Sequence, residues 1–188
     1  MAGQVVLDEH PQRNHDDATA KKNIEDDVKK WFFNGSTVKL TQLNGLRDVE
    51  APLVAEFDVE LPSTGAVTGS RALVPLAVFS AAAKSPLSSE RRKNEVYFHH
   101  QYRVDDDVTL DVPAGYAVEA MPSPQNNDLG GLAFTTQYQK TPESVRLVRN
   151  LSVKTVAIDA EKYNVVRNFF KQVATADQDQ VVLKKAAK

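Results

Sequence analysis

One short segment of the sequence concentrates the residue types that metal binding and acid–base catalysis use. The segment FHHQYRVDDDV, residues 98–108, places His99 and His100 near the three consecutive aspartates at 105–107. Imidazole and carboxylate groups could ligate a metal ion or transfer protons if the fold brought them together. However, successive side chains of a β-strand point to opposite faces, so two adjacent histidines on a strand cannot chelate one metal ion jointly.

The aspartate run also lacks the glycine and the distal glutamate of an EF-hand loop. The segment therefore predicts a strand that ends in a solvated acidic turn at 105–107, with no metal site. We expect His100 to share the apolar face with Phe98 and Tyr102, where a half-buried imidazole could titrate near neutrality. A hydrogen-bonded core histidine is the favoured interpretation, and a hydrolase built from His100 and the aspartates is an alternative.

Other catalytic signatures are missing from the sequence. The chain has no cysteine, which excludes a disulfide, a thiolate zinc site and a cysteine nucleophile. No G-x-S-x-G, G-x-G-x-x-G or P-loop motif occurs. Arg91, Arg92 and Lys93 form a basic cluster that is typical of a solvated loop, with anion binding as the less favoured interpretation. We therefore predict no catalytic, cofactor-binding or metal-ligating residue, and favour a binding or structural module.

The overall charge favours neither nucleic acid nor a membrane as a partner. The 188 residues contain 23 Lys and Arg against 25 Asp and Glu, a formal net charge of -2, without a polybasic segment. No apolar run approaches the roughly 20 residues that span a bilayer. The polar start lacks the apolar middle of a secretory signal.

Hydrophobic periodicity predicts a helix in the first part of the chain. Residues 1–15 are polar and are expected to form a flexible tail or linker. A helix is predicted over 17–33, with Asp16 or Asp17 as the N-cap. Its apolar stripe consists of Ala20, Ile24, Val28, Trp31 and Phe32, which we expect to pack in the core.

The period then changes to two, which predicts strands. We expect strands at 37–43 and 52–62, and over 71–79 either a buried strand or a strand that is interrupted at Pro75. The polar connector 81–95 is the predicted internal boundary.

The second half of the chain is also predicted to be rich in β-structure. The first elements are a hairpin-like pair at 95–104 and 108–113, joined around 105–107, and a short strand at 117–122. A turn at Gly130-Gly131 is followed by a hairpin at 132–140 and 144–158 with its tip at 141–143. A helix at 160–173, with Asp159 as its N-cap, and a terminal strand at 180–183 complete the chain. Tyr163, Phe169 and Phe170 fall on the apolar stripe of that helix.

Strands that follow one another through turns favour antiparallel sheets. The predicted fold is mainly β and antiparallel, like a β-sandwich, with one N-terminal and one C-terminal helix. The predicted organisation is a tail at 1–15, a helix plus β segment at 16–88 and a β-sandwich module with its helix at 89–188. The last two segments could share one core.

The order of segments in the second half resembles the C-terminal region of bacterial transglutaminase-like proteins, in which a β-rich module follows a papain-like core. The matching segments are LDVPAGYAVEAMP, a closing helix with the pattern Y-x-x-x-R-x-F-F and the strand VVLKK, and NGLRDVEAPLVAEFDVELP is similar to the segment linking core and module. The likeness spans roughly residues 36–185. The resemblance implies that a Cys-His-Asp triad belongs to an upstream core, and none of that triad is present in this chain.

The resemblance therefore implies a non-catalytic accessory module of a larger periplasmic or secreted protein, whose partners are upstream domains of the same chain. No cofactor is implied. A free-standing binding module for a cell-envelope glycan or peptide is the alternative, although the strands offer only scattered Tyr97, Tyr102 and Tyr138 as a ligand platform.

Overall fold

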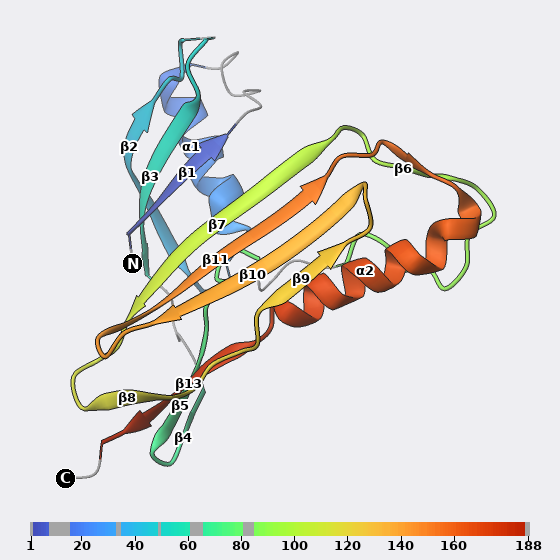
Figure 1. Cartoon of the computed structure of the whole chain (residues 1–188). Helices are drawn as coiled ribbons and strands as arrows, with labels where there is room; N and C mark the ends of the chain where they lie inside the picture. Colours follow the sequence, from blue (N-terminus) through green and yellow to red (C-terminus); the bar gives the residue numbers. More distant parts are fainter. Residues whose placement is uncertain are drawn as a thin grey trace. The chain divides into compact units, whose positions relative to one another are not determined.

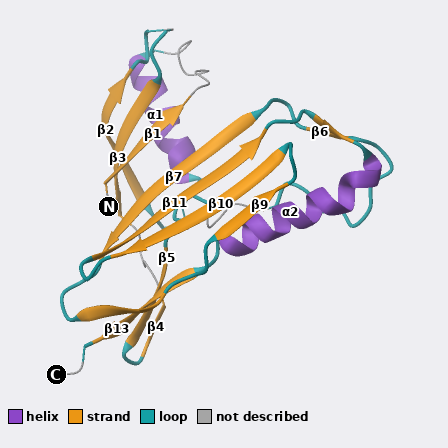
Figure 2. Ribbon diagram, viewed as in Figure 1, coloured by secondary structure: helices purple, strands orange, loops and turns teal. Residues whose placement is uncertain are grey.

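A computed structural model of the chain describes residues 2–7, 16–32, 35–48, 50–60, 66–80 and 85–186. The chain divides into two units, Met1–Ser63 and Thr64–Lys188. Both units are dominated by antiparallel strands, and each contains one α-helix (Figures 1 and 2). The prediction of a mainly β, antiparallel fold with an N-terminal and a C-terminal helix is therefore confirmed.

The first unit contains a three-stranded antiparallel sheet and helix α1. The strand order is β1 (Ala2–Leu7), β3 (Leu53–Glu60) and β2 (Thr37–Asn44). Strand β3 alternates as predicted, with its odd-numbered residues buried and most of the others more exposed. One face of the strand therefore forms core, as its two-residue hydrophobic period requires.

Helix α1 (Asp17–Lys29) begins at the predicted N-cap. The Asp16 carboxylate accepts hydrogen bonds from the backbone N–H groups of Ala18 and Thr19, at 3.1 and 3.0 Å. The predicted stripe packs inward, because Ala20, Ile24, Val28 and Phe32 are buried, and Trp31 is half-buried.

The predicted N-terminal tail is partly wrong. Residues 2–7 form β1, which pairs with β3 from Ala2 opposite Asp58 to Leu7 opposite Leu53. The composition of residues 1–15 as a whole did not indicate this strand, because its hydrogen bonds come from pairing with β3, about 50 residues away. The remaining predicted tail, including His10 and His15, lies outside the described residues.

The second unit is built from two four-stranded antiparallel sheets, a short two-stranded ribbon and helix α2 (Tyr163–Ala176). The strand order is β7-β11-β10-β9 in one four-stranded sheet and β4-β5-β13-β8 in the other, and β12 pairs with β6 in the ribbon. The bounds are β4 Ala66–Thr68, β5 Arg71–Pro75, β6 Val96–Tyr97, β7 Tyr102–Asp111, β8 Tyr116–Ala120, β9 Gln125–Asp128, β10 Leu132–Lys140, β11 Ser144–Val153, β12 Ala157–Ile158 and β13 Gln180–Lys185, with a short 3-10 helix η2 at Ala160–Lys162 before α2.

One face of the β7-β11-β10-β9 sheet packs against two different layers. At one end it packs against α2, in a core that includes Leu151 and Val153 of β11 with Phe169 and Phe170 of α2. At the other end, the inner face of β11 shares a core with strands of the second sheet. Figure 1 shows α2 running beside β9, and a hydrogen bond from the Asn127 side chain to Gln172 joins the two elements. The unit therefore resembles a sandwich at one end and a helix-covered sheet at the other.

Several predicted elements of this unit are confirmed. Strands β10 and β11 form the expected hairpin, whose tip is closed by the Thr141 hydroxyl as it accepts hydrogen bonds from the N–H groups of Glu143 and Ser144. Gly130 lies in the turn before β10 with a φ of 80°, a conformation that glycine adopts without strain. Strand β5 ends at Pro75 and is exposed at its start and half-buried beyond, so the alternative of a strand interrupted at Pro75 is confirmed and that of a buried strand over 71–79 is wrong. The predicted stripe residues of α2 are buried. Asp159 precedes η2, but its side chain makes no capping hydrogen bond.

The predicted turn at 105–107 is wrong. Strand β7 runs without interruption through the aspartates and pairs with β11 from Tyr102 opposite Val153 to Asp111 opposite Ser144. The acidic run is compatible with a strand because each of its three carboxylates has a basic or amide partner. The local composition indicated a turn, but the long pairing with β11 supplies more backbone hydrogen bonds than a turn could.

The division into units also differs from the predicted one. It lies at Ser63/Thr64, whereas the sequence suggested the connector near residue 88. The reason is that β5 pairs with β13, with Val74 opposite Val181, so this early strand belongs to the sheet that closes the chain. The predicted boundary thus falls between β5 and β6, inside a single unit.

Candidate functional site

A group of charged side chains is buried in the interior of the second unit, around Arg149. This arginine occupies an inward position of β11, opposite Asp106 of β7 and Thr136 of β10. Its side chain is 3% exposed, and those of Asp106 and Asp177 are 7% and 5% exposed. Because strand neighbours alternate, the same face of β11 carries apolar residues on both sides of Arg149.

The guanidinium of Arg149 is held from several directions. Its Nε and Nη2 atoms donate to the two carboxylate oxygens of Asp177 at 2.6 and 2.8 Å, which is the bidentate geometry of a strong charge-assisted pair. Its Nη1 atom donates to Asp106 Oδ2 at 3.2 Å, and the Ser80 hydroxyl donates to the same oxygen at 3.2 Å. The guanidinium carbon lies 5.3 Å from the centre of the Phe134 ring.

These contacts join four separate parts of the second unit. Asp177 is the C-cap residue of α2, Asp106 belongs to β7, and Ser80 belongs to the loop after β5. Arg149 itself lies between the two apolar cores described above, because Leu147 belongs to one and Leu151 to the other. We call Arg149, Asp106, Asp177 and Ser80 the buried ionic cluster.

The electrostatics of the cluster are unbalanced, since it holds one cation and two carboxylates. Burial raises the pKa of Asp106 above its usual value of 3.8, and the attraction of Arg149 and the Ser80 hydrogen bond offset this only in part. The cluster is closed to solvent and its groups are paired with one another. Such an arrangement suits holding elements in register, whereas a catalytic group must reach a substrate.

Sequence reasoning missed Arg149, Asp177 and Ser80 and assigned Asp106 to a turn. A signal was present in the alternation of β11, because Arg149 falls on the same parity as Val145, Leu147, Leu151 and Val153. A charged residue at an inward position of a strand predicts a buried partner, but the sequence does not say where the partner lies.

The two histidines of the opening segment do not form a site. His99 and His100 lie in a bend between β6 and β7, and both are exposed. The predictions that they belong to a strand and that His100 is half-buried are therefore wrong; the strand begins only at Tyr102, where pairing with β11 starts. The His100 ring meets the edge of the Tyr102 ring at 6.2 Å. Across the described ranges, no group of three or more His, Asp or Glu side chains is arranged to hold a metal ion.

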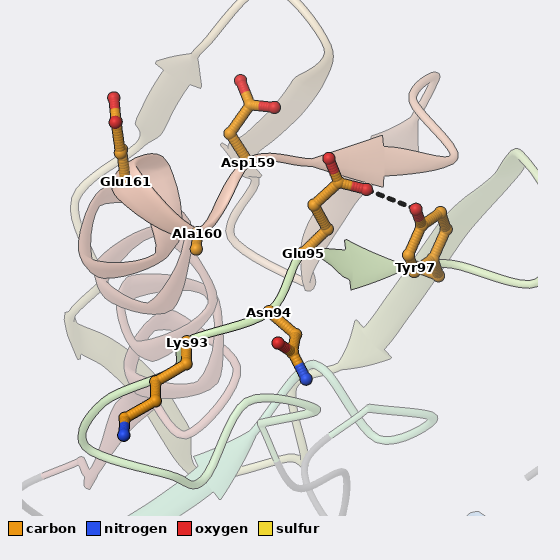
Figure 3. A pocket seen from close by; sticks show the side chains of 7 residues that line it. All are labelled: Lys93, Asn94, Glu95, Tyr97, Asp159, Ala160 and Glu161. Carbon is orange, nitrogen blue, oxygen red and sulfur yellow. Dashed lines mark hydrogen bonds between the residues drawn. The ribbon is translucent and has the colours of Figure 1, made fainter.

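An open pocket of about 600 Å³ lies where η2 meets β6 (Figure 3). Glu95, Asp159 and Glu161 line it, together with Lys93 and Tyr97. The Tyr97 hydroxyl donates a hydrogen bond to the Glu95 carboxylate, which raises the pKa of the tyrosine. Figure 3 shows the carboxylates spread around the opening, with none of them directed at a common point.

Residues 70–183 match a family of domains that is described as a domain of unknown function with a solved structure, DUF3858. The match covers more than half of the 188 residues. The chain belongs to the DUF3858 family. The DUF3858 region lies within the second unit and includes the buried ionic cluster, the pocket and the connector.

One solved structure is also similar to the chain. It is a crystal structure of a "putative protease" from Parabacteroides distasonis ATCC 8503, with 12% sequence identity and a TM-score of 0.47. The similarity covers 82% of this chain, which spans about a quarter of that protein, since 24% of its length is covered. A search of curated proteins found no significant match to the DUF3858 chain.

The described part of the chain contains no helix that is both long and apolar enough to cross a membrane.

Proposed function

We propose that the chain is a non-catalytic accessory module of a larger transglutaminase-like envelope protein, in which it positions an upstream catalytic core or the substrate of that core. We further propose that this protein is periplasmic or secreted, and that upstream domains of the same chain are its partners, with an envelope peptide or glycan as a possible ligand.

The observation that supports this proposal is that the buried ionic cluster pairs its charged groups with one another. Asp106, Arg149 and Asp177 are directed at one another in the interior, where they connect α2 to the sheet. Histidines are the usual acid–base groups at neutral pH, and the two that the structure describes, His99 and His100, lie outside this cluster in an exposed bend. A unit arranged in this way supplies a rigid shape to a neighbour more readily than it supplies reactive groups.

The first test is the activity of the purified chain alone. We expect no incorporation of a fluorescent amine into casein and no release of dye from labelled casein. An activity that falls when His100 is replaced by glutamine, with the unfolding midpoint unchanged, would overturn the proposal and favour the hydrolase interpretation.

The second test uses the source gene. We expect the same reading frame to encode an upstream core with Cys, His and Asp. In the protein made from that frame, removal of residues 64–188 should raise the KM for a protein substrate and leave the kcat for a small amine unchanged. An equal loss of kcat on both substrates would show that the module is part of the catalytic machinery.

A further inference from the structure

The arginines of the second unit fall into two groups. Those that lie on strands each pair with a carboxylate: Arg71, Arg103, Arg146 and Arg149. The other three, Arg91, Arg92 and Arg167, form no ion pair with any residue that the structure describes. The arginines without an ion partner are thus the ones that lie outside the strands of this unit.

The unpaired arginines are brought to one flank of α2. The Tyr163 hydroxyl donates a hydrogen bond of 2.6 Å to the carbonyl oxygen of Ser89, and the rings of Phe98 and Phe170 lie 5.9 Å apart. The segment 89–98, which contains Arg91 and Arg92, is thus fixed on α2 at both of its ends. Arg167 lies four residues after Tyr163 and three before Phe170, so it occupies the same flank between these two contacts.

The guanidinium of Arg167 is partly removed from water without an internal acceptor. Its Nε atom is buried and has no hydrogen-bond partner in the described structure, although the residue as a whole is only half-buried. A buried donor without an acceptor is uncommon in proteins, and its acceptor is often a water molecule, an ion or a bound ligand. Partial burial also lowers the local dielectric constant, which strengthens the attraction of Arg167 for an anion at its accessible edge.

The surrounding cations are exposed. Arg91, Arg92 and Lys93 lie in segment 89–98, and Lys171 lies one helical turn beyond Arg167. Figure 3 shows the Lys93 ammonium pointing away from the carboxylates of the adjacent pocket. We call these five residues, Arg91, Arg92, Lys93, Arg167 and Lys171, the cationic surface.

We propose that the cationic surface binds an acidic peptide segment through its carboxylates. Guanidinium groups hold carboxylates in a bidentate geometry, and three of the five residues are arginines. A short acidic peptide can be held by these few cations, whereas binding of nucleic acid typically uses a larger basic face on a domain with an excess of Lys and Arg, and this chain has 23 Lys and Arg against 25 Asp and Glu. This inference concerns the second unit alone, and it holds whether or not the parent protein has a catalytic core.

The test is binding of a fluorescein-labelled oligoglutamate peptide to the full chain, followed by fluorescence anisotropy at low salt. Oligoglutamine and oligolysine peptides serve as controls for the peptide. Inorganic phosphate and vesicles of phosphatidylcholine with phosphatidylglycerol serve as other sources of anions. We expect saturable binding of oligoglutamate only.

Three variants locate the binding site. The double variant Arg91→Gln/Arg92→Gln changes only exposed side chains and should fold normally, and we expect it and Arg167→Gln each to weaken binding about tenfold, the scale of a lost charge-assisted contact. The control matched in charge to Arg167→Gln is Arg71→Gln, which removes one positive charge from an arginine that is already paired with Glu119, and it should leave binding unchanged.

Two outcomes would overturn the inference. One is no binding of oligoglutamate, including the case in which only phosphate or vesicles bind. The other is equal weakening by Arg71→Gln and by Arg167→Gln, each of which removes one positive charge, because this would mark a non-specific charge effect. The casein assays above do not depend on this surface, so failure here is distinguishable from failure of the proposed function.

Discussion

At the scale of single residues, the face of the strand on which a charged residue lies decides how much its ion pair contributes to stability. Arg146 and Arg149 both lie on β11 and both pair with an aspartate of β7, yet Arg149 is buried, whereas the Arg146 pair is about half exposed. An exposed pair contributes little because water solvates and screens both charges. A buried pair is different, since the loss of one partner leaves an uncompensated charge in the interior.

We therefore predict that Arg149→Ala destabilises the second unit by about 3–5 kcal/mol, because two buried carboxylates lose their cation. Arg146→Ala on the same strand should cost less than about 1 kcal/mol. Urea unfolding followed by circular dichroism measures both. Similar losses for the two variants would contradict the structural role of the buried ionic cluster.

The neighbouring aspartates of β7 should respond to pH in opposite directions. Burial raises the pKa of Asp106, so the folded state binds this proton more readily than the unfolded state does, and the contribution of Asp106 to stability falls as pH rises through its folded pKa. The hydrogen bond from Arg146 lowers the pKa of Asp107, so its contribution is present above the unfolded pKa and is lost on acidification.

The prediction compares two variants at about pH 4 and about pH 7. Asp106→Asn should gain stability relative to the wild type as the pH rises, because it lacks the buried charge. Asp107→Asn should lose stability relative to the wild type over the same range. Urea midpoints at the two pH values test both, and parallel behaviour of the two variants would be incompatible with their assigned positions.

At the scale of elements, the core between α2 and the sheet depends on a few large side chains. Phe169 is 2% exposed and lies against Phe170 at a ring distance of 5.3 Å. Phe169→Ala should cost about 3–5 kcal/mol, through lost burial and the cavity that remains. Val165→Ala on the same helix is the control, since Val165 is 54% exposed and its truncation should cost less than about 0.5 kcal/mol. Equal losses in thermal unfolding would show that α2 packs through another face.

The link between β2 and β3 in the first unit depends on a glycine. Gly45 has a φ of 77°, and a Cβ atom built there would lie 2.1 Å from the Pro52 carbonyl oxygen. Gly45→Ala should therefore cost clearly more than the roughly 1 kcal/mol of a left-handed backbone alone. Gly69→Ala is the control, because Gly69 has a φ of 61° but an open space around its Cβ position. Thermal unfolding of the two variants measures the difference, and a smaller loss at Gly45 would argue against this close approach.

Most elements could be predicted from local patterns, because α1, α2 and β3 bury stripes whose period is visible in the sequence. Strand β1 and the course of β7 through its aspartates could not. Their hydrogen bonds come from β3 and β11, which are remote in the sequence, and local composition does not predict which remote strands pair.

At the scale of the whole molecule, the division into two units has a direct consequence. Strands β4 and β5 belong to the same sheet as the C-terminal strand β13. The second unit therefore needs the residues of β4 and β5 as much as those of β13 in order to fold. We predict that a fragment of residues 64–188 folds alone, whereas a fragment of 89–188 does not, because the latter lacks the partner strand of β13. Dispersed amide resonances in a two-dimensional NMR spectrum identify a folded fragment. A folded 89–188 fragment would support the boundary that the sequence suggested.

The sequence by itself determined the class of the fold, the helices and the absence of cysteine chemistry, because these follow from composition and from periods of a few residues. Only the tertiary structure decided which charges are buried and which remain unpaired. Arg149 meets Asp177 and Asp106 across 28 and 43 positions, and Arg167 reaches the flank that Ser89 and Phe98 contact through the packing of α2. Such pairings depend on non-local strand order and register, which local sequence patterns do not encode.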